Sequence, residues 1–355
     1  MPLPHFPHPP TQVQILSCLI DAIAKHHNIT KVLDIGAGQG YLDAALAFGY
    51  RHTVIGVDDD EVQTCGAKRR TGLIEKLYAR PKNRAQAVGR LLHVNRRVTA
   101  SESFTDLLAE VADDRWLLCG LHTCGDLAPA MIRHFLESNA QVLVGVGCCY
   151  NKLTELDGAP PPAPHPRAAT SAPASPADIP TSPGRPGRML SCQATCRWAT
   201  DPSAADNFTR HFYRALLQLL IHSRGLIPPG VTTFSLTVGR LGRRAFDNGF
   251  AGYAQLALPR LGIDAEAAGL DAPALNAYWL AHAEREKEVA VAWTLRALVA
   301  EALESLILVD RFAYLEEVGG AGSEGEPPSV VVDMFPLFEY VDSPRNMVIV
   351  AQKRT

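Results

Sequence analysis

No run of residues in this sequence is both long and apolar enough to cross a lipid bilayer. The nearest candidate, residues 297–309, carries Glu301 and Glu304. The first ten residues are rich in proline and histidine, and they lack the basic start and apolar run of a secretory signal. We therefore expect neither a membrane partner nor a secretory signal.

Cysteine is also scarce, with eight in 355 residues. That number does not suit a disulfide scaffold in a chain of this length, and the adjacent Cys148 and Cys149 are poorly placed to bridge each other. A reducing compartment is expected, cytoplasmic or nuclear. Cys192 and Cys196 have no partner pair at zinc-site spacing, so the sequence predicts no metal.

What the sequence does contain is a glycine-rich stretch between two predicted strands. Residues 31–35 interleave apolar side chains with Asp34 and predict a short buried strand, and residues 41–48 predict the helix that follows. The second strand, 53–58, ends in Asp58, where a nucleotide-binding βαβ unit holds a ribose hydroxyl. Between the first strand and its helix, alternate glycines let the backbone approach a ligand closely (Gly36, Gly38, Gly40).

Two details favour one nucleotide cofactor over another. Tyr41 takes the place of the third glycine of a dinucleotide fingerprint, and Asp34 would repel a pyrophosphate. A carboxylate at Asp34 can instead accept a hydrogen bond from an ammonium, while Asp58 accepts from a ribose. S-adenosylmethionine, with an amino acid at one end and a ribose in the middle, suits both acids. A dinucleotide oxidoreductase, or a structural turn in which Asp34 is only a cap, are the alternatives.

Predicted strands and helices alternate through the first part of the chain. Helices are expected at 11–27, 59–80, 104–112 and 129–136, and strands at 97–100, 116–121 and 141–147. This alternation favours an α/β fold with a doubly wound, mostly parallel sheet. Two terminal strands, 330–335 and 347–351, predict a β-hairpin that closes the sheet edge.

Composition divides the chain into three parts. Residues 1–154 form the cofactor-binding half, residues 155–188 are a disordered insertion rich in Pro, Ala and Ser, and residues 189–355 complete the sheet with a helical insertion. Helices at 205–223 and 250–261 and a strand at 231–239 are expected in the last part. Residues 284–317 contain no Gly or Pro and predict one long helix, with apolar positions assigned to core packing (Val289, Trp293, Val299, Leu303, Leu306, Ile307).

Ligands of doubly wound sheets bind outside the carboxyl ends of the strands, so residues after the fourth and fifth strands are candidates for chemistry. His122 is a candidate for proton removal, because histidine is the residue type whose unperturbed pKa suits that task, or it is a hydrogen-bonded histidine at a strand end. Asp126 is a second candidate catalytic residue, with helix N-capping as the alternative. Four more residues are expected to line a substrate pocket, although the cysteines among them could be small apolar fillers (Cys124, Cys148, Cys149, Tyr150).

These motifs resemble a known family. The glycine stretch, Leu-His-Thr-Cys-Gly-Asp-Leu at 121–127, Gly-Cys-Cys-Tyr-x-Lys-Leu at 147–153 and a terminal Pro-Leu-Phe…Ser-Pro-Arg-Asn resemble the methyltransferase-like protein 25 family, some of whose members are labelled ribosomal RNA adenine dimethylase domain-containing. The cysteine motifs are more distantly similar to tRNA 2′-O-methyltransferases. The resemblance implies a seven-strand class I methyltransferase (Rossmann-like) fold and S-adenosylmethionine as cofactor.

The sequence departs from this family at two places. The region ahead of the first strand is short and reads Thr11-Gln12-Val13-Gln14, where relatives usually carry a Lys/His/Glu-bearing segment, so a truncated start is one reading. No Asn-Pro-Pro-Tyr-like motif follows the fourth strand, so the residues do not support adenine dimethylation.

Charge is distributed unevenly along the chain. Residues 68–97 hold ten basic residues and one acid, a charge of +9, so the rest of the chain sums to −12 within a net charge of −3. Such a segment is the footprint expected for phosphate contacts and predicts RNA, rather than DNA, as partner. A solvated helix face is the alternative.

Methyl transfer asks the protein to align donor and acceptor, exclude water and remove a proton, because the sulfonium is already activated. His122 is the residue expected to take that proton. A cysteine nucleophile is not needed for oxygen or nitrogen acceptors. A protein or small-molecule methyltransferase, or a catalytically silent scaffold that binds RNA, are the alternative functions.

Overall fold

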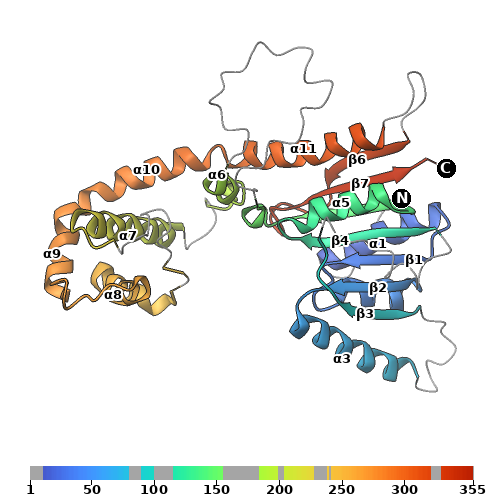
Figure 1. Ribbon diagram of the computed structural model, residues 1–355, viewed down its shortest axis with the longest axis horizontal. Helices are drawn as coiled ribbons and strands as arrows, with labels where there is room; N and C mark the ends of the chain where they lie inside the picture. The colour runs from blue at the N-terminus through green and yellow to red at the C-terminus, as the bar shows by residue number, and fades with distance from the viewer. Residues whose placement is uncertain are drawn as a thin grey trace, which may run out of the picture. The chain divides into compact units, whose positions relative to one another are not determined.

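The computed structural model describes residues 11–79, 89–99, 115–154, 184–198, 204–227, 238–239, 241–320 and 329–354. The chain divides into two compact units (Figure 1). Unit 1 comprises Met1–Gln193 and Ala300–Thr355, and unit 2 comprises Ala194–Val299. The end of the chain therefore belongs to the same unit as its beginning.

Unit 1 is built on a seven-stranded sheet with the order β3-β2-β1-β4-β5-β7-β6 (Figure 1). Its strands are β1 Lys31–Ile35, β2 Thr53–Asp58, β3 Leu91–Asn95, β4 Trp116–Thr123, β5 Ala140–Gly147, β6 Val330–Pro336 and β7 Met347–Lys353. Strands β1 to β5 pair in parallel, whereas β7 runs antiparallel to both β5 and β6. The predicted doubly wound sheet with a terminal hairpin is confirmed.

Strand β1 shows why both faces of the sheet are covered. Successive side chains of a strand point to opposite faces. Val32 packs with Leu16 of α1 (Gln12–His26) in one core, while Leu33 packs with Phe135 of α5 (Leu127–Glu137) in the other. Each fully buried side chain of this size contributes roughly 1.5–3 kcal/mol relative to exposure, so the pattern fixes the strand between two helical layers.

The helices of unit 1 around the first two strands, α1, α2 (Tyr41–Ala44) and α3 (Glu61–Tyr78), lie where the sequence predicts helices. Helix α1 begins at a capping box made by Thr11 and Gln14. Helix α2 continues as a π turn, Ala45–Gly49, and α3 begins at Asp60, whose carboxylate accepts from the amides of Val62 and Gln63. The other two helices are α6 Gly184–Leu190 and α11 Ala300–Gly319.

Two predictions for unit 1 are wrong. The third strand is Leu91–Asn95, not residues 97–100, because Leu91 to Asn95 pair with Val54 to Asp58 of β2. The insertion predicted to be disordered to residue 188 ends in helix from Gly184 onward. The predicted helix 104–112, almost all of strand 231–239 and residues 155–183 lie outside the described residues.

Unit 2 is helical. Its core joins residues of α7 (Ala204–Ser223), α8 (Gly249–Ala257) and α9 (Ala272–His282), among them Phe212, Tyr253 and Leu275. No helix among the described residues is long and apolar enough to cross a membrane.

The long helix predicted over 284–317 is wrong as a single element. Helix α10 (Glu286–Ala297) ends before a turn at Leu298 and Val299, and α11 begins at Ala300. The division falls where the packing changes: Val289 packs on the unit 2 core, whereas Leu315 packs on the sheet. Val299 and Leu306 are exposed rather than in a core.

Candidate cofactor and acceptor site

The glycine loop between β1 and α2 is held against β2. The amides of Gly36 and Ala37 donate to the carbonyl of Val57 at 2.8 and 3.1 Å. The loop glycines have φ values of +76°, +55° and +70°, the left-handed region that favours glycine (Gly36, Gly38, Gly40). With this backbone conformation, the middle glycine of the loop, Gly38, faces an open space beside the loop.

That space lies at Gly38. A Cβ added at Gly36 would lie 2.9 Å from Leu127 Cδ2, and one added at Gly40 would lie 2.7 Å from His93 Cε1. A Cβ at Gly38 would meet nothing within 4 Å. Gly38 therefore borders open space where a ligand can approach the backbone.

Asp58, at the end of β2, contacts the same loop. Its Oδ2 accepts from the Gly38 amide at 2.9 Å, and its Oδ1 accepts from the Asp60 amide at 2.9 Å. A carboxylate offers about four acceptor positions, so both oxygens can still accept from ribose hydroxyls. The backbone bonds hold the carboxylate at the edge of the loop before any ligand arrives.

Asp34 lies near the end of β1 and is buried. Its side chain is 1% exposed and lies beside Asp43 and Cys119. Burial raises the pKa of Asp34 well above its usual range, and the Asp43 carboxyl raises it further. The raised pKa favours the protonated carboxyl, which is a weaker partner for an ammonium than a carboxylate, and the predicted bond from the donor's amino group to Asp34 stays a prediction.

This raised pKa predicts a pH-dependent stability. The folded state retains a proton that the unfolded chain releases above pH about 4, so Asp34 makes folding less favourable as pH rises toward its folded pKa. Asp34→Asn should melt a few degrees higher than wild type at neutral pH, and the two should converge near pH 4. Thermal melts across this range test it, with the exposed Asp59→Asn as control. A lower melting temperature for Asp34→Asn at every pH would contradict it.

Arg70 of α3, which the sequence analysis counted in the basic segment 68–97, contacts the glycine loop, a role that the sequence did not indicate. Its guanidinium carbon lies 3.9 Å from the Tyr41 ring centroid, and Nη2 donates to the Tyr41 hydroxyl at 3.0 Å. Nη1 donates to the Gln39 carbonyl. Arg70 thereby fixes the end of the glycine loop. No local pattern signals a pairing between residues so distant in sequence.

His122 occupies a distorted end of β4. Leu121 pairs with Val146 and Thr123 with Gly147, which leaves His122 out of register between them. Its φ is +63°, unusual for a residue with a side chain, and the side chain is exposed. Backbone strain of this kind clusters at functional sites, which agrees with the candidate catalytic role.

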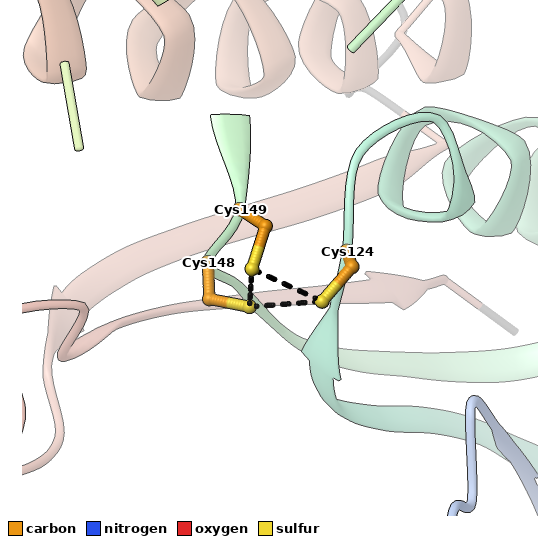
Figure 2. A group of neighbouring side chains, drawn as sticks. All are labelled: Cys124, Cys148 and Cys149. Atoms are coloured by element: carbon orange, nitrogen blue, oxygen red, sulfur yellow. Dashed lines mark hydrogen bonds between the residues drawn. The ribbon is translucent and has the colours of Figure 1, made fainter. Parts of the chain in front are cut away.

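Three of the predicted pocket residues come together beyond His122. The sulfurs of Cys124, Cys148 and Cys149 point toward one another (Figure 2) and are separated by 3.2 to 3.4 Å. Hydrogen bonding with Cys148 lowers the pKa of Cys124 to about 5, with further help from Cys149, Lys152 and His122. The same contact raises the pKa of Cys148, so one negative charge concentrates at Cys124.

The other two residues predicted here have structural contacts. Asp126 occupies the N-cap position of α5 as expected, but its side chain makes no capping bond. Its oxygens accept instead from the Thr154 amide at 2.9 Å and the Thr154 hydroxyl at 2.6 Å. The pocket role of Tyr150 also needs correction, because its side chain is 1% exposed. Its hydroxyl donates to Glu304 Oε1 at 3.1 Å, and the same Glu304 forms an ion pair with Arg345.

A match to a known family agrees with three features of unit 1: the sheet order, the glycine loop and the acid at the end of β2. The family described as a methyltransferase domain matches residues 11–156. Residues 11–156 form a methyltransferase domain. The strand order with an antiparallel seventh strand is that of the predicted class I methyltransferase fold, and S-adenosylmethionine is the methyl donor of such a domain.

Curated relatives of this methyltransferase domain support the predicted resemblance. The probable methyltransferase-like protein 25 of Homo sapiens is 30% identical over 264 residues, covering 72% of this chain and 40% of that protein. Its Mus musculus counterpart is 28% identical over 269 residues with the same coverage. The chain thus spans about 40% of the length of the curated relatives it matches.

A solved structure is also similar to this chain. It is an S-adenosylmethionine-dependent methyltransferase from Clostridium acetobutylicum, 12% identical, with a TM-score of 0.27 over 40% of this chain and 53% of that one.

Proposed function

We propose that this chain is an S-adenosylmethionine-dependent methyltransferase that acts on RNA. The glycine loop and Asp58 hold the donor, and the bulge at His122 presents an exposed imidazole at the carboxyl end of β4. The residues after β4 lack the Asn-Pro-Pro-Tyr motif of nucleic-acid methyltransferases that act on amino groups. His122 would accept the proton that the acceptor loses, and S-adenosylmethionine, when bound, would supply the methyl group.

The observation that carries the RNA assignment is a set of exposed basic residues on α3 and just after β3, which we term the α3 basic surface (Lys68, Arg69, Lys76, Arg97). Arg69 and Lys76 are seven residues apart and share one helix face. None of the four forms an ion pair with another described residue. Phosphates would neutralise this charge, with release of counterions from the RNA.

Arg70 does not belong to this surface. Its side chain is occupied by Gln39 and Tyr41, so reversing it would disturb the cofactor loop rather than test phosphate binding. Arg70 nevertheless links α3 to that loop, so an RNA strand bound on α3 would lie near the methyl donor.

Reversing Lys68, Arg69 and Arg97 together to glutamate should weaken RNA binding regardless of sequence. If each of the three contacts one phosphate, the affinity of the variant should depend less steeply on salt. The magnitude of the slope of log affinity against log salt concentration should decrease by about 2 for single-stranded RNA, at about 0.7 per phosphate. Fluorescence anisotropy with labelled RNA over a salt series measures both quantities, and S-adenosylmethionine binding should be unchanged.

A matched control reverses three exposed basic residues elsewhere in the chain: Arg133 of α5, Arg224 just after α7 and Lys287 of α10. It changes the net charge equally and should leave the salt slope nearly intact. Equal slopes for the two triple variants, or RNA binding that does not respond to salt, would contradict the proposal and favour a protein or small-molecule acceptor.

This function also implies where the protein works. Seven cysteines among the described residues are free thiols (Cys18, Cys65, Cys119, Cys124, Cys148, Cys149, Cys192), which agrees with a reducing compartment that contains RNA, cytoplasm or nucleus. Fluorescence microscopy of the tagged protein tests this, and a signal confined to the secretory pathway would contradict it.

A further inference from the structure

The three cysteines beyond β4 and β5 form a compact sulfur triangle (Figure 2). Cys124 Sγ lies 3.4 Å from Cys148 Sγ and 3.2 Å from Cys149 Sγ, and the last two sulfurs are 3.4 Å apart. All three side chains are partly buried. We call this group the cysteine triangle.

Mutual thiol contacts do not explain such an arrangement well. A thiol is a weak hydrogen-bond donor and its sulfur a weak acceptor, so three of them in contact gain little from each other. Thiolates are good ligands for soft cations. A cation at the centre of the cysteine triangle would gain three metal–sulfur bonds.

The backbone holds the two turns of the triangle together without any ligand. The Gly125 amide donates to the Cys149 carbonyl at 3.2 Å, and the Lys152 amide donates to the same carbonyl at 3.0 Å. A Cβ at Gly125 would lie 2.5 Å from the Lys152 carbonyl oxygen, and Gly125 has a φ of +55°. Only glycine allows the turns to approach this closely, so the ligand set is preorganised.

Buried charged side chains contact Tyr150, which follows Cys149 in the turn after β5. Arg311 and Arg345 place their guanidinium carbons 5.4 and 5.7 Å from the Tyr150 ring centroid. The Tyr150 hydroxyl donates to Glu304. A metal ligand needs supporting contacts that set its orientation, and Tyr150, adjacent to Cys149, receives them.

We propose that Cys124, Cys148 and Cys149 bind a zinc ion. With zinc–sulfur bonds of about 2.3 Å, a tetrahedral site separates its sulfurs by about 3.8 Å, so the triangle needs to open by only about 0.4–0.6 Å. Among the described residues no fourth His, Cys, Asp or Glu joins the group. The fourth position is therefore open to water or to an acceptor, as in catalytic rather than structural zinc sites.

The sequence alone predicted no metal. Cys124 and the adjacent pair that follows it 24 and 25 residues later do not match zinc-finger spacing. The sheet brings them together, since β4 and β5 are parallel neighbours whose carboxyl ends meet at one edge.

Metal analysis of the purified full chain tests this proposal. Inductively coupled plasma mass spectrometry of wild-type protein, purified with reductant and without chelator, should find about one zinc per chain. Cobalt added to the zinc-free protein should give thiolate-to-cobalt charge-transfer absorption and tetrahedral d–d bands. Both signals should be lost in Cys124→Ser and Cys149→Ser, and retained in the controls Cys192→Ser and Cys65→Ser.

Titration of each variant with S-adenosylmethionine separates this proposal from the proposed function. Cofactor binding that is preserved in Cys124→Ser shows that the fold survives, and loss of metal alone then supports the zinc site. Metal at background in wild type with no cobalt spectrum would overturn the proposal. So would a cobalt spectrum that Cys124→Ser retains, or a disulfide within the cysteine triangle whose reduction restores no metal binding.

Discussion

Gly38→Arg is expected to weaken S-adenosylmethionine binding by about 100-fold or more. An L-residue in the left-handed region costs about 1–2 kcal/mol, and Gly38 has a φ of +55°. The new side chain also enters the open space beside the loop and disturbs the bond from the Gly38 amide to Asp58. Because each 1.4 kcal/mol is tenfold in affinity, the combined effect should place binding beyond the range of isothermal titration calorimetry.

Gly72→Arg is the matched control for this variant. Gly72 lies in α3, has ordinary helical backbone, and a Cβ there would meet nothing within 4 Å. The substitution adds the same side chain and the same charge without touching the loop, so affinity should stay within about twofold of wild type. Tight binding to Gly38→Arg would show that the cofactor does not use this loop.

His122→Ala should lower the rate of methyl transfer by about 10²–10⁴-fold, the usual contribution of a positioned general base. Affinity for S-adenosylmethionine should remain, because the imidazole is separate from the glycine loop. The deficit should shrink as pH rises, since an acceptor that has already lost its proton needs no base. Single-turnover rates over a pH series measure this dependence.

A second substitution separates the imidazole from the backbone at this position. Asparagine tolerates positive φ better than alanine does, so His122→Asn keeps the bulge while removing the base. Both variants should lose similar activity, whereas His26→Ala, an exposed histidine of α1, should lose none. Full activity in His122→Asn would mean that only the backbone shape matters.

The parts of the fold that the sequence predicted correctly are those determined by short-range pattern. Alternating apolar residues around Asp34 and the glycines after it specify a strand and turn, whatever the rest of the chain does. The terminal hairpin follows from two apolar runs with a turn between them. Strand β3 was missed because Leu91–Asn95 carries His93 within a basic segment, and only pairing with β2 makes it a strand.

The site depends more on contacts between distant residues. Asp34 was placed correctly in the first strand, but its raised pKa depends on its burial and on Asp43, which the helix after the loop brings beside it. Arg70 and the cysteine triangle join residues from different elements. Such groupings follow from the strand order and not from spacing, so a single sequence does not reveal them.

The central claim is that this chain transfers a methyl group from S-adenosylmethionine to RNA. Incubation with methyl-labelled S-adenosylmethionine, total RNA and, separately, RNA-free extract tests it most directly. Wild-type protein should label the RNA fraction, Gly72→Arg should do the same, and Gly38→Arg and His122→Ala should not. Wild-type protein that binds the cofactor but labels no RNA, or that labels only the RNA-free fraction, would contradict the account.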